Sequence, residues 1–341
     1  MPDPDRILLI QLRRIGDVLL ATPAFRAVRR RFPAARIELL IEPAYTPLVH
    51  RNPHLDGLLA VPRRQSLTRN LAALADIRRR RYDLTIDFLG KPRTALWSRL
   101  SGARRRIGYD TPGRRWCYTE RVSPGDPAAY TVRHKEALLA PIGAELDDES
   151  LDFPIEAGDR DAVARELAAA GHDDETPVAA LAPGARRDDK RWPAERFAEL
   201  ADRLVDARGC RVLLVCGPGE EDDARRVRRH MRHPCIFTEE RPPLPRVQAL
   251  LERCRIFIGN DTGLRHMAVA AGLPTVAVFG QPRPSNWTPP DDPRHRSLAC
   301  DPGCKAACRF PRCGRECLLG VTVDEAWQAV RAVWEQTEHR P

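Results

Sequence analysis

The segment that most restricts the fold of this chain lies at residues 256–280. An apolar run at 256–259 is followed by the polar turn 260–263, a helical stretch and a second apolar run at 275–279. This order predicts a strand–helix–strand unit of a parallel sheet. The polar turn then lies at the carboxyl end of a strand, where open parallel sheets bind ligands. Free N–H groups at the start of the following helix favour an anion such as a diphosphate.

Similar alternation extends through the whole chain, and a second polar turn, Ile15-Gly16-Asp17, follows an apolar run near its start. Strands are predicted at 6–12, 36–41, 58–61, 83–88, 106–109, 178–181, 211–215, 235–237, 256–259 and 275–279. Helices are predicted at 18–32, 66–81, 159–170, 193–208, 220–231, 245–253 and 322–338, while residues 122–160 are less regular and residues 281–320 are rich in loops and proline. A polar linker at 172–177 separates the two series. We therefore predict an α/β chain with two parallel-sheet domains, 1–170 and 176–322, and a C-terminal helix at 323–341.

The charge of the chain is concentrated in its first half. Residues 1–150 hold 27 Lys and Arg against 17 Asp and Glu, whereas the remainder holds 29 against 30. This asymmetry favours an anionic partner of the first half, namely nucleic acid, an acidic membrane face or an acidic sugar. With only four lysines in the chain, an alternative is that the arginine excess reflects genome composition. Aromatic residues make up only 6% and are not interleaved with the arginines, which disfavours nucleic acid.

Other features of the sequence indicate a cytoplasmic location. No apolar run approaches the roughly 18 residues that span a bilayer. The N-terminal segment 1–5 is acidic, with two aspartates, and leads directly into a predicted strand, unlike a signal peptide. A dinucleotide-dependent oxidoreductase is disfavoured because no Gly-x-Gly-x-x-Gly pattern follows the first strand.

Two predicted strand-to-helix turns carry the candidate chemistry. Asp17 can act as a general base toward a sugar hydroxyl, or it can cap a helix. In the late turn, Thr262 and the amides near Gly263 can donate to phosphate oxygens, beside Asp261 and His266. The alternative for this turn is a capped helix with a packing histidine.

Two further charged residues follow strands of the second half. Lys190 can neutralise a diphosphate leaving group in place of a metal ion, or it can belong to a solvated charge run. Glu221, after a Gly-Pro-Gly turn, occupies the position of an acidic residue that binds ribose hydroxyls, or it is an exposed glutamate at the start of a helix.

Half of the ten cysteines gather in the loop-rich segment, at Cys300, Cys304, Cys308, Cys313 and Cys317. Four thiolates can hold a structural zinc ion, although the spacing is not the paired Cys-x-x-Cys of most zinc sites. An iron–sulfur cluster is a second interpretation, and reduced thiols packed in a small satellite core are a third.

The motifs resemble the heptosyltransferases of lipopolysaccharide core synthesis, glycosyltransferase family 9. The resemblance covers nearly the whole chain and rests on residues 14–19, 188–193, 259–266 and 274–280. It implies a GT-B fold, with two Rossmann-like domains facing a central cleft. It also implies inverting, metal-independent transfer of heptose from ADP-heptose to a Kdo- or heptose-containing lipopolysaccharide inner-core acceptor.

Within this resemblance, Asp17 matches the catalytic base and Lys91 an acceptor-side lysine. The residues that match donor contacts are Lys190, Glu221, Asp261, Thr262, Gly263 and His266. The lipid acceptor implies peripheral contact with the cytoplasmic face of the inner membrane, with no nucleic-acid partner. Two alternatives stay open: a GT-B transferase of another nucleotide sugar, and a non-catalytic protein that binds nucleotide sugars or nucleic acid.

Overall fold

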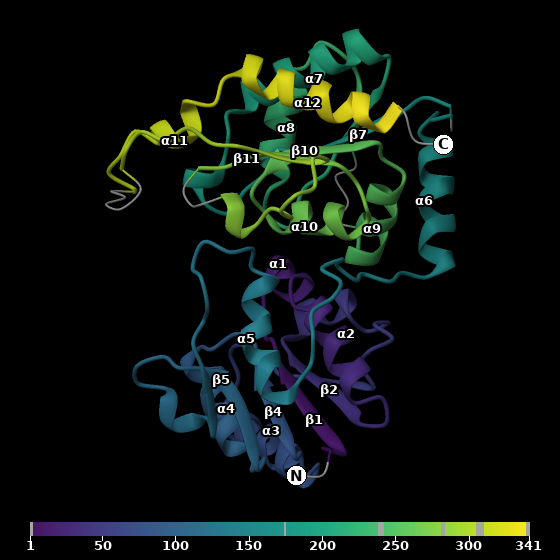
Figure 1. Cartoon of the computed structure of the whole chain (residues 1–341). Helices are drawn as coiled ribbons and strands as arrows, with labels where there is room; N and C mark the ends of the chain where they lie inside the picture. The colour runs from purple at the N-terminus through teal and green to yellow at the C-terminus, as the bar shows by residue number, and fades with distance from the viewer. Residues whose placement is uncertain (1–2, 174, 238–241, 281–283, 305–309, 339–341) are drawn as a thin grey trace. The chain divides into compact units, whose positions relative to one another are not determined.

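The structure, a computed structural model, describes residues 3–173, 175–237, 242–280, 284–304 and 310–338. The chain forms two compact units, Met1–Pro154 and Ile155–Pro341 (Figure 1, purple to blue and teal to yellow). The first helix after this boundary, α6 (Ala157–Ala169), packs against α9 (Leu244–Glu252) of the second unit. The boundary therefore lies ahead of this helix, whereas the sequence analysis placed the helix in the first domain.

The first unit contains a parallel sheet with the strand order β3-β2-β1-β4-β5-β6 among its described residues. Its strands are β1 (Arg6–Ile10), β2 (Arg36–Ile41), β3 (Gly57–Ala60), β4 (Leu84–Asp87), β5 (Arg105–Tyr109) and β6 (Glu120–Val122). Its α-helices are α1 (Ile15–Leu19), α2 (Thr22–Arg31), α3 (Leu67–Arg79), α4 (Pro92–Leu100) and α5 (Glu136–Leu139). Short 3₁₀ helices are η1 (Pro43–Leu48), η2 (Arg115–Cys117), η3 (Arg133–Lys135) and η4 (Ala140–Ile142).

The second unit repeats this topology with the order β12-β11-β10-β7-β8-β9 over the part that the structure describes. Its strands are β7 (Val178–Ala182), β8 (Arg211–Leu214), β9 (Cys235–Phe237), β10 (Ile256–Asn260), β11 (Thr275–Val278) and β12 (His295–Leu298). Its remaining helices are α7 (Ala194–Arg208), α8 (Glu221–His230), α10 (Gly263–Ala270), α11 (Glu316–Leu319) and α12 (Val323–Glu338), with the 3₁₀ helices η5 (Asp188–Lys190) and η6 (Pro284–Asn286).

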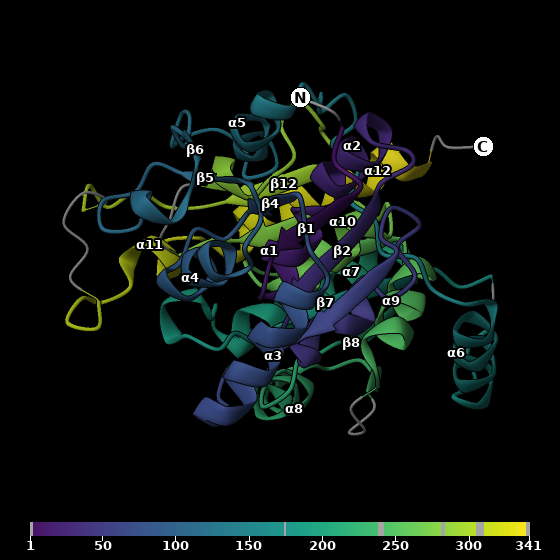
Figure 2. The same cartoon turned by 90° about the horizontal axis from the view of Figure 1, so that it is seen from below.

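Helices cover both faces of each sheet. In the second unit, α7, α8 and α12 lie on one face, and α9 and α10 lie on the other (Figure 1). In the first unit, α3 and α4 cover one face of the sheet and pack against each other (Figures 1 and 2). The C-terminal helix α12 thus completes the core of the second unit, since Val330, Val333 and Trp334 are buried there.

The two strand orders place the polar turns at equivalent positions. Both sheets are doubly wound: from two neighbouring central strands, the connections run outward in opposite directions. Ligands bind outside the carboxyl ends of these two strands, at the topological switch point. These strands are β1 and β4 in the first unit, and β7 and β10 in the second. Asp17 and Lys91 follow the first pair, whereas Lys190 and Asp261 follow the second.

Three local predictions were wrong. The helix predicted at 18–32 is broken into α1 and α2, because Pro23 in the first turn of α2 has no N–H to continue the α1 ladder. The edge strand β12 lies in the segment 281–320, which was predicted to be rich in loops, and the edge strand β6, which begins just before the segment 122–160, was not predicted. Neither carries an apolar run, and each pairs with a single neighbouring strand.

Candidate functional site

The loops after β7 and β10 are fixed to each other by Asn260. This side chain is fully buried and ends β10 beside β7. Its Nδ2 donates to the Pro183 carbonyl at 2.7 Å, and its Oδ1 accepts from the Trp192 amide at 3.1 Å. Asn260 lies in the motif 259–266, but no role was predicted for it. Its hydrogen bonds hold both ends of the loop that carries Lys190.

Lys190 and Asp261 meet across these two loops. The Lys190 Nζ donates to the Asp261 Oδ2 at 2.5 Å. The Asp261 side chain is only 5% exposed, while the Lys190 side chain is 27% exposed. Two residues 71 positions apart in the sequence are therefore an ion pair at the topological switch point, with the ammonium group on the more accessible side.

Helix α10 presents two buried polar atoms that have no hydrogen-bond partner among the described residues. They are the Oγ1 of Thr262, at the N-cap, and the Nδ1 of His266, one turn later. The Thr262 hydroxyl does not cap the helix, and the first-turn N–H groups have no intrahelical acceptors. Buried polar atoms without partners are uncommon and costly. An anionic ligand at this helix end would satisfy them.

His266 is held in its neutral form. Its side chain is buried, and burial together with the neighbouring Arg265 guanidinium lowers its pKa to about 3. A neutral imidazole has one donor and one acceptor nitrogen. His266 can therefore donate a hydrogen bond to a phosphate or sugar oxygen without carrying a charge.

A wall beside this helix is formed by residues 284–288. Arg265, which is fully buried, donates to the Trp287 carbonyl at 2.8 Å and to the Thr288 Oγ1 at 2.9 Å. The Trp287 ring centroid lies 6.1 Å from that of His266. The arginine of the motif thus has a structural role that its sequence position did not reveal, because it fixes the wall next to His266.

The acidic position after β8 is shared by two adjacent glutamates. Glu221, the predicted ribose ligand, is the first residue of α8 and is partly exposed. Its neighbour Glu220 is buried, accepts from the Gly217 amide at 3.0 Å, and has a pKa raised by burial. A Cβ at Gly184 would lie 2.6 Å from Glu220 atoms, so Glu220 fills the space between two loops. Glu221 is thus the more accessible carboxylate.

Gly280 sets the distance between the end of β11 and the loop that carries Lys190. A Cβ at this position would lie 1.9 Å from the Asp189 carbonyl oxygen, which belongs to the backbone of η5. Any side chain here would displace η5 and, with it, Lys190. The lack of space for a Cβ therefore explains why the motif 274–280 ends in a glycine.

In the first unit, Asp17 lies in the first turn of α1, after β1. Its Oδ2 accepts from the Arg14 amide at 3.2 Å, the contact expected for the helix-capping alternative. Its Oδ1 makes no hydrogen bond with described residues, and the side chain is partly exposed. One oxygen therefore orients the carboxylate, while the other can accept a further hydrogen bond.

The end of β4 adds a buried charged group near Asp17. Lys135, from η3, is buried and donates from Nζ to the Phe88 carbonyl at 3.2 Å. Burial lowers its pKa, whereas the nearby carboxylates of Asp17 and Asp87 oppose that shift. Lys135 was not predicted as a site residue, because no pattern in the surrounding sequence indicates that it is buried. Lys135 therefore places a buried amine near the Asp17 carboxylate.

Asp87 and Lys91 have different surroundings. Asp87 is fully buried, where its carboxylate accepts from the Leu89 and Gly90 amides at 3.0 Å each and from the Tyr118 hydroxyl at 2.7 Å. These contacts fix the turn after β4. Lys91, the predicted acceptor-side lysine, is exposed at the N-cap of α4.

The cysteine segment does not form a metal cage among the described residues, in which no three Cys, His, Asp or Glu side chains gather closely enough to hold an ion. Cys300 and Cys317 pack against the core, and the Cys300 amide donates to the Cys317 carbonyl at 3.2 Å. Cys304 and Cys313 are free thiols, and Cys308 lies outside the described residues. The zinc and iron–sulfur interpretations therefore stay predictions.

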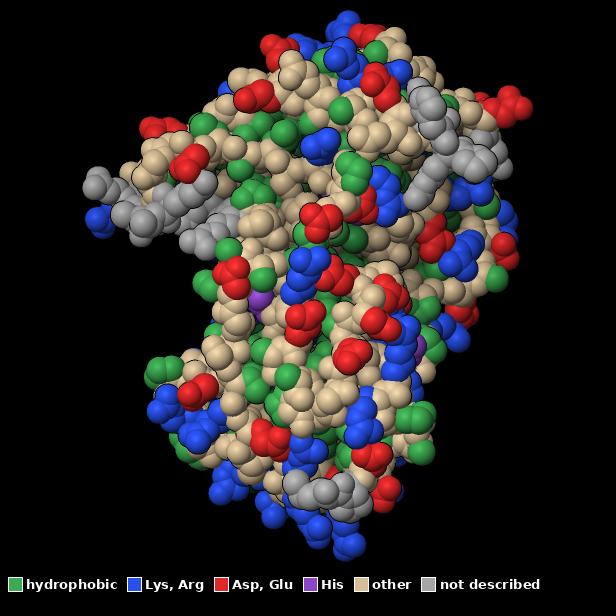
Figure 3. Space-filling view, viewed as in Figure 1, with side chains coloured by type: hydrophobic (Ala, Val, Ile, Leu, Met, Phe, Trp, Pro, Cys, Tyr) green, Lys and Arg blue, Asp and Glu red, His purple; other side chains and the backbone are tan. Residues whose placement is uncertain are grey.

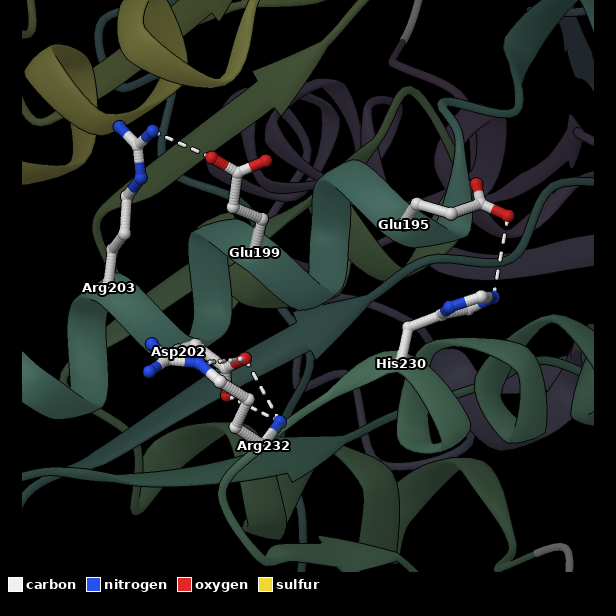
Figure 4. A pocket seen from close by; sticks show the side chains of 6 residues that line it. All are labelled: Glu195, Glu199, Asp202, Arg203, His230 and Arg232. Carbon is white, nitrogen blue, oxygen red and sulfur yellow. Dashed lines mark hydrogen bonds and ion pairs between the residues drawn. The ribbon is translucent and has the colours of Figure 1, made fainter.

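A cavity of about 460 Å³ lies elsewhere, between α7 and the end of α8 (Figure 4). It is lined by Glu195, Glu199, Asp202, Arg203, His230 and Arg232. These charged groups pair with one another: Arg203 with Glu199, Arg232 with Asp202 and His230 with Glu195. Because the charges neutralise each other and none follows a strand, we assign no ligand to it.

Two doubly wound units, each with polar groups at its switch point, define a chain of the GT-B class. The fold is similar to that of the family 9 glycosyltransferase from Veillonella parvula, with a TM-score of 0.83, 20% identity and coverage of 97% of each chain. It is also similar to Escherichia coli ADP-heptose lipopolysaccharide heptosyltransferase II, with a TM-score of 0.79, 21% identity and coverage of 98% and 99%. The predicted fold class is confirmed.

The sequence comparison gives the family. The model of glycosyltransferase family 9 (heptosyltransferase) matches residues 71–311, so the chain belongs to this family of glycosyltransferases. A curated relative, lipopolysaccharide heptosyltransferase 3 of Escherichia coli, is 26% identical over 293 residues, which cover 82% of this chain and 84% of the relative. The resemblance inferred from the motifs is thereby confirmed, while the roles of individual site residues stay predictions.

Proposed function

We propose that this chain transfers heptose from ADP-heptose to a Kdo- or heptose-containing inner-core acceptor of lipopolysaccharide. Family membership supports the reaction class, and the related proteins named above are lipopolysaccharide heptosyltransferases. The observation that carries the donor assignment is the set of groups at the second switch point. A lysine ion pair lies there beside a helix start at which two buried polar atoms have no hydrogen-bond partner among the described residues.

The donor diphosphate would lie against the start of α10. Lys190 would exchange part of its contact with Asp261 for a phosphate oxygen, while Thr262 and the amides at Gly263 donate to the same group. The neutral His266 adds a hydrogen bond, and the accessible Glu221 accepts from a ribose hydroxyl. Positive charge from Lys190 and the helix end stabilises the departing ADP, without a metal ion in this step.

The acceptor hydroxyl would be activated from the first unit. Asp17 takes the hydroxyl proton as the oxygen attacks the anomeric carbon, and the bond from that carbon to the diphosphate breaks with inversion. Lys91 contacts the acceptor.

The same proposal places the protein at the cytoplasmic face of the inner membrane, bound peripherally. Across the described residues, no helix has the length and apolar character needed to cross a bilayer. The basic first half supplies electrostatic attraction to anionic lipids. A lipid-borne acceptor would be met at that surface.

Release of ADP tests the donor assignment. The purified chain is incubated with truncated lipopolysaccharide acceptors and either ADP-heptose or a panel of UDP- and GDP-sugars, with and without a chelator. We expect acceptor-dependent ADP release from ADP-heptose that the chelator leaves unchanged. Turnover of another nucleotide sugar would replace the donor, and binding without turnover of any donor would support a non-catalytic protein.

The Asp17→Asn variant tests the base. Asparagine can still accept from the Arg14 amide, so the turn is retained while the basic oxygen is lost. Turnover should fall at least about 100-fold, the range of general-base catalysis, with ADP affinity unchanged. Exposed Asp5, replaced by Asn in the same unit, is the control and should keep full activity. Near-normal turnover of Asp17→Asn would remove Asp17 from this role.

A further inference from the structure

The large hydrophobic side chains that the described structure leaves exposed gather in one part of the first unit. They are Leu67, Leu71, Leu96 and Trp116, with exposed fractions of 74%, 57%, 45% and 62%. Leu67 and Leu71 lie in the first two turns of α3, Leu96 lies in α4 and Trp116 in η2. Scattered apolar residues are normal on protein surfaces, but a group of them interleaved with charge marks an interaction site.

These elements are neighbours in the fold. Helix α3 packs against α4, and η2 contacts α4. The views in Figures 1 and 2 agree on the pairing of α3 with α4. Arg93 of α4 also donates to the carbonyls of Pro62 and Arg63, which ties the segment before α3 to α4. We refer to Leu67, Leu71, Leu96 and Trp116 with the arginines around them as the α3–α4 surface.

The start of α3 lies toward the carboxyl ends of the strands, the end of the sheet that carries Asp17. Helices α3 and α4 and the 3₁₀ helix η2 follow β3, β4 and β5, and each begins after the carboxyl end of its strand. Asp17 follows the carboxyl end of β1 in the same parallel sheet. Leu67 and Leu71, in the first two turns of α3, are therefore on the same side of the unit as the proposed base.

Positive charge is concentrated in the same segment. Residues 61–119 contain 15 Lys and Arg but only 4 Asp and Glu, a net charge of +11, whereas the whole chain carries +9. Seven exposed arginines of this segment form no ion pair with described residues: Arg63, Arg64, Arg69, Arg78, Arg81, Arg99 and Arg104. In Figure 3, Lys and Arg side chains crowd the rim of the first unit together with hydrophobic ones. The uncompensated charge is complementary to an anionic surface.

We propose that the α3–α4 surface docks on an anionic lipid bilayer. Leucine and tryptophan side chains enter the headgroup region, where tryptophan is favoured, while unpaired arginines are attracted to anionic lipids. Nucleic acid would use the charge but leave three exposed leucines without a partner. The purpose of this docking rests on the proposed function: it would bring a lipid-borne acceptor to the side of the unit where Asp17 lies.

Vesicle binding tests the proposal without donor or acceptor, so its outcome is independent of the proposed reaction. The full chain is sedimented with vesicles of phosphatidylcholine containing 30% phosphatidylglycerol, or of phosphatidylcholine alone. We expect binding to the anionic vesicles that weakens with salt. A chain with Leu67→Gln, Leu71→Gln, Leu96→Gln and Trp116→Gln should bind at least tenfold more weakly.

Charge variants separate the two contributions. Replacing Arg63, Arg64 and Arg69 by Gln should weaken binding about a hundredfold, since each basic residue near such a surface contributes about fivefold. The matched control replaces Arg226, Arg228 and Arg229, exposed residues of α8, and should bind as the parent does. The apolar variant should retain ADP release with a deacylated, water-soluble acceptor, which shows that it is folded.

Three outcomes would overturn the proposal. The first is a parent chain with no preference for anionic vesicles, and the second is an apolar variant that binds as tightly as the parent. The third is a parent chain that is a dimer in solution and that the apolar substitutions convert to a monomer. The last result would assign the surface to a second copy of this chain. Loss of transferase activity with intact vesicle binding would instead count only against the proposed function.

Discussion

Two buried histidines should make the stability of the second unit fall as the pH decreases. Burial lowers the pKa of His266 to about 3 and that of His295 to about 4. The His295 Nδ1 also lies 3.0 Å from the Thr275 Oγ1 in the core of the sheet. Below about pH 6.5 the unfolded chain binds a proton at each histidine, whereas the folded unit does not. The free energy of unfolding therefore decreases as the pH falls from 6.5 toward the folded-state pKa values.

The size of the effect follows from linkage. One pKa unit corresponds to about 1.4 kcal/mol, so lowering the pH from 7.5 to 5.0 should remove about 2 kcal/mol per histidine and about 4 kcal/mol for both. Burial raises the pKa of Glu220 and Asp223 in the same unit, which stabilises the fold at low pH and opposes this trend. The histidine contribution must therefore be obtained by comparing variants.

Urea unfolding at pH 7.5 and 5.0, followed by tryptophan fluorescence, measures this contribution. Trp192 and Trp334 are buried in the second unit and report its unfolding. His266→Gln and His295→Gln should each reduce the pH dependence by about 2 kcal/mol, and the double variant by about 4 kcal/mol. His230→Gln, at a half-exposed position of the same unit, is the control. A stability loss common to both pH values cancels in this comparison.

The reasoning would be refuted if the double variant kept the pH dependence of the parent chain. A second measurement covers a variant that does not fold. In the parent protein, the NMR signals of the His266 and His295 rings should not titrate between pH 7.5 and 5.0. A midpoint near 6.5 at either ring would show that its burial does not exclude the charged form.

Two further predictions concern the switch point of the second unit. Lys190→Met should weaken ADP binding, measured by calorimetry, by about tenfold or more, because a hydrogen bond to a charged group contributes about 1.5–3 kcal/mol. The control, Lys91→Met, should bind ADP with the affinity of the parent chain. Unchanged affinity of Lys190→Met would exclude a contact between Lys190 and the donor. Gly280→Ala should destabilise the chain by about 1–3 kcal/mol and weaken ADP binding, because its Cβ would overlap the Asp189 carbonyl. Gly158→Ala, where a Cβ meets open space, is the control; equal unfolding curves for both variants would contradict the steric argument.

Much of the candidate site was predictable because its residues follow strands directly. A polar turn after an apolar run identifies the carboxyl end of a parallel strand, and this pattern located Asp17, Lys190 and the residues 261–266. This pattern cannot tell which of two adjacent residues of the same type faces the site. Nothing in the sequence distinguishes Glu220 from Glu221, yet one is buried between loops and the other is accessible.

Roles that depend on burial were also hidden. Asn260 and Arg265 stand inside the predicted motif, but their hydrogen bonds reach Pro183, Trp192 and Trp287, which are distant in sequence. Lys135 lies in an irregular segment, and only packing brings it near Asp17. Desolvation and long-range contacts are properties of the folded chain, so no local pattern reports them.

The sequence by itself determined the alternation of strands and helices, the division into two parallel-sheet units and the family. Apolar periodicity and turn residues are local properties, so they can be read from residues that are close together in the sequence. Only the tertiary structure decided the edge strands β6 and β12, the membership of α6 in the second unit and the pairing of Lys190 with Asp261. Each of these depends on which distant segments become neighbours, because their stabilising contacts do not exist until the sheet has formed.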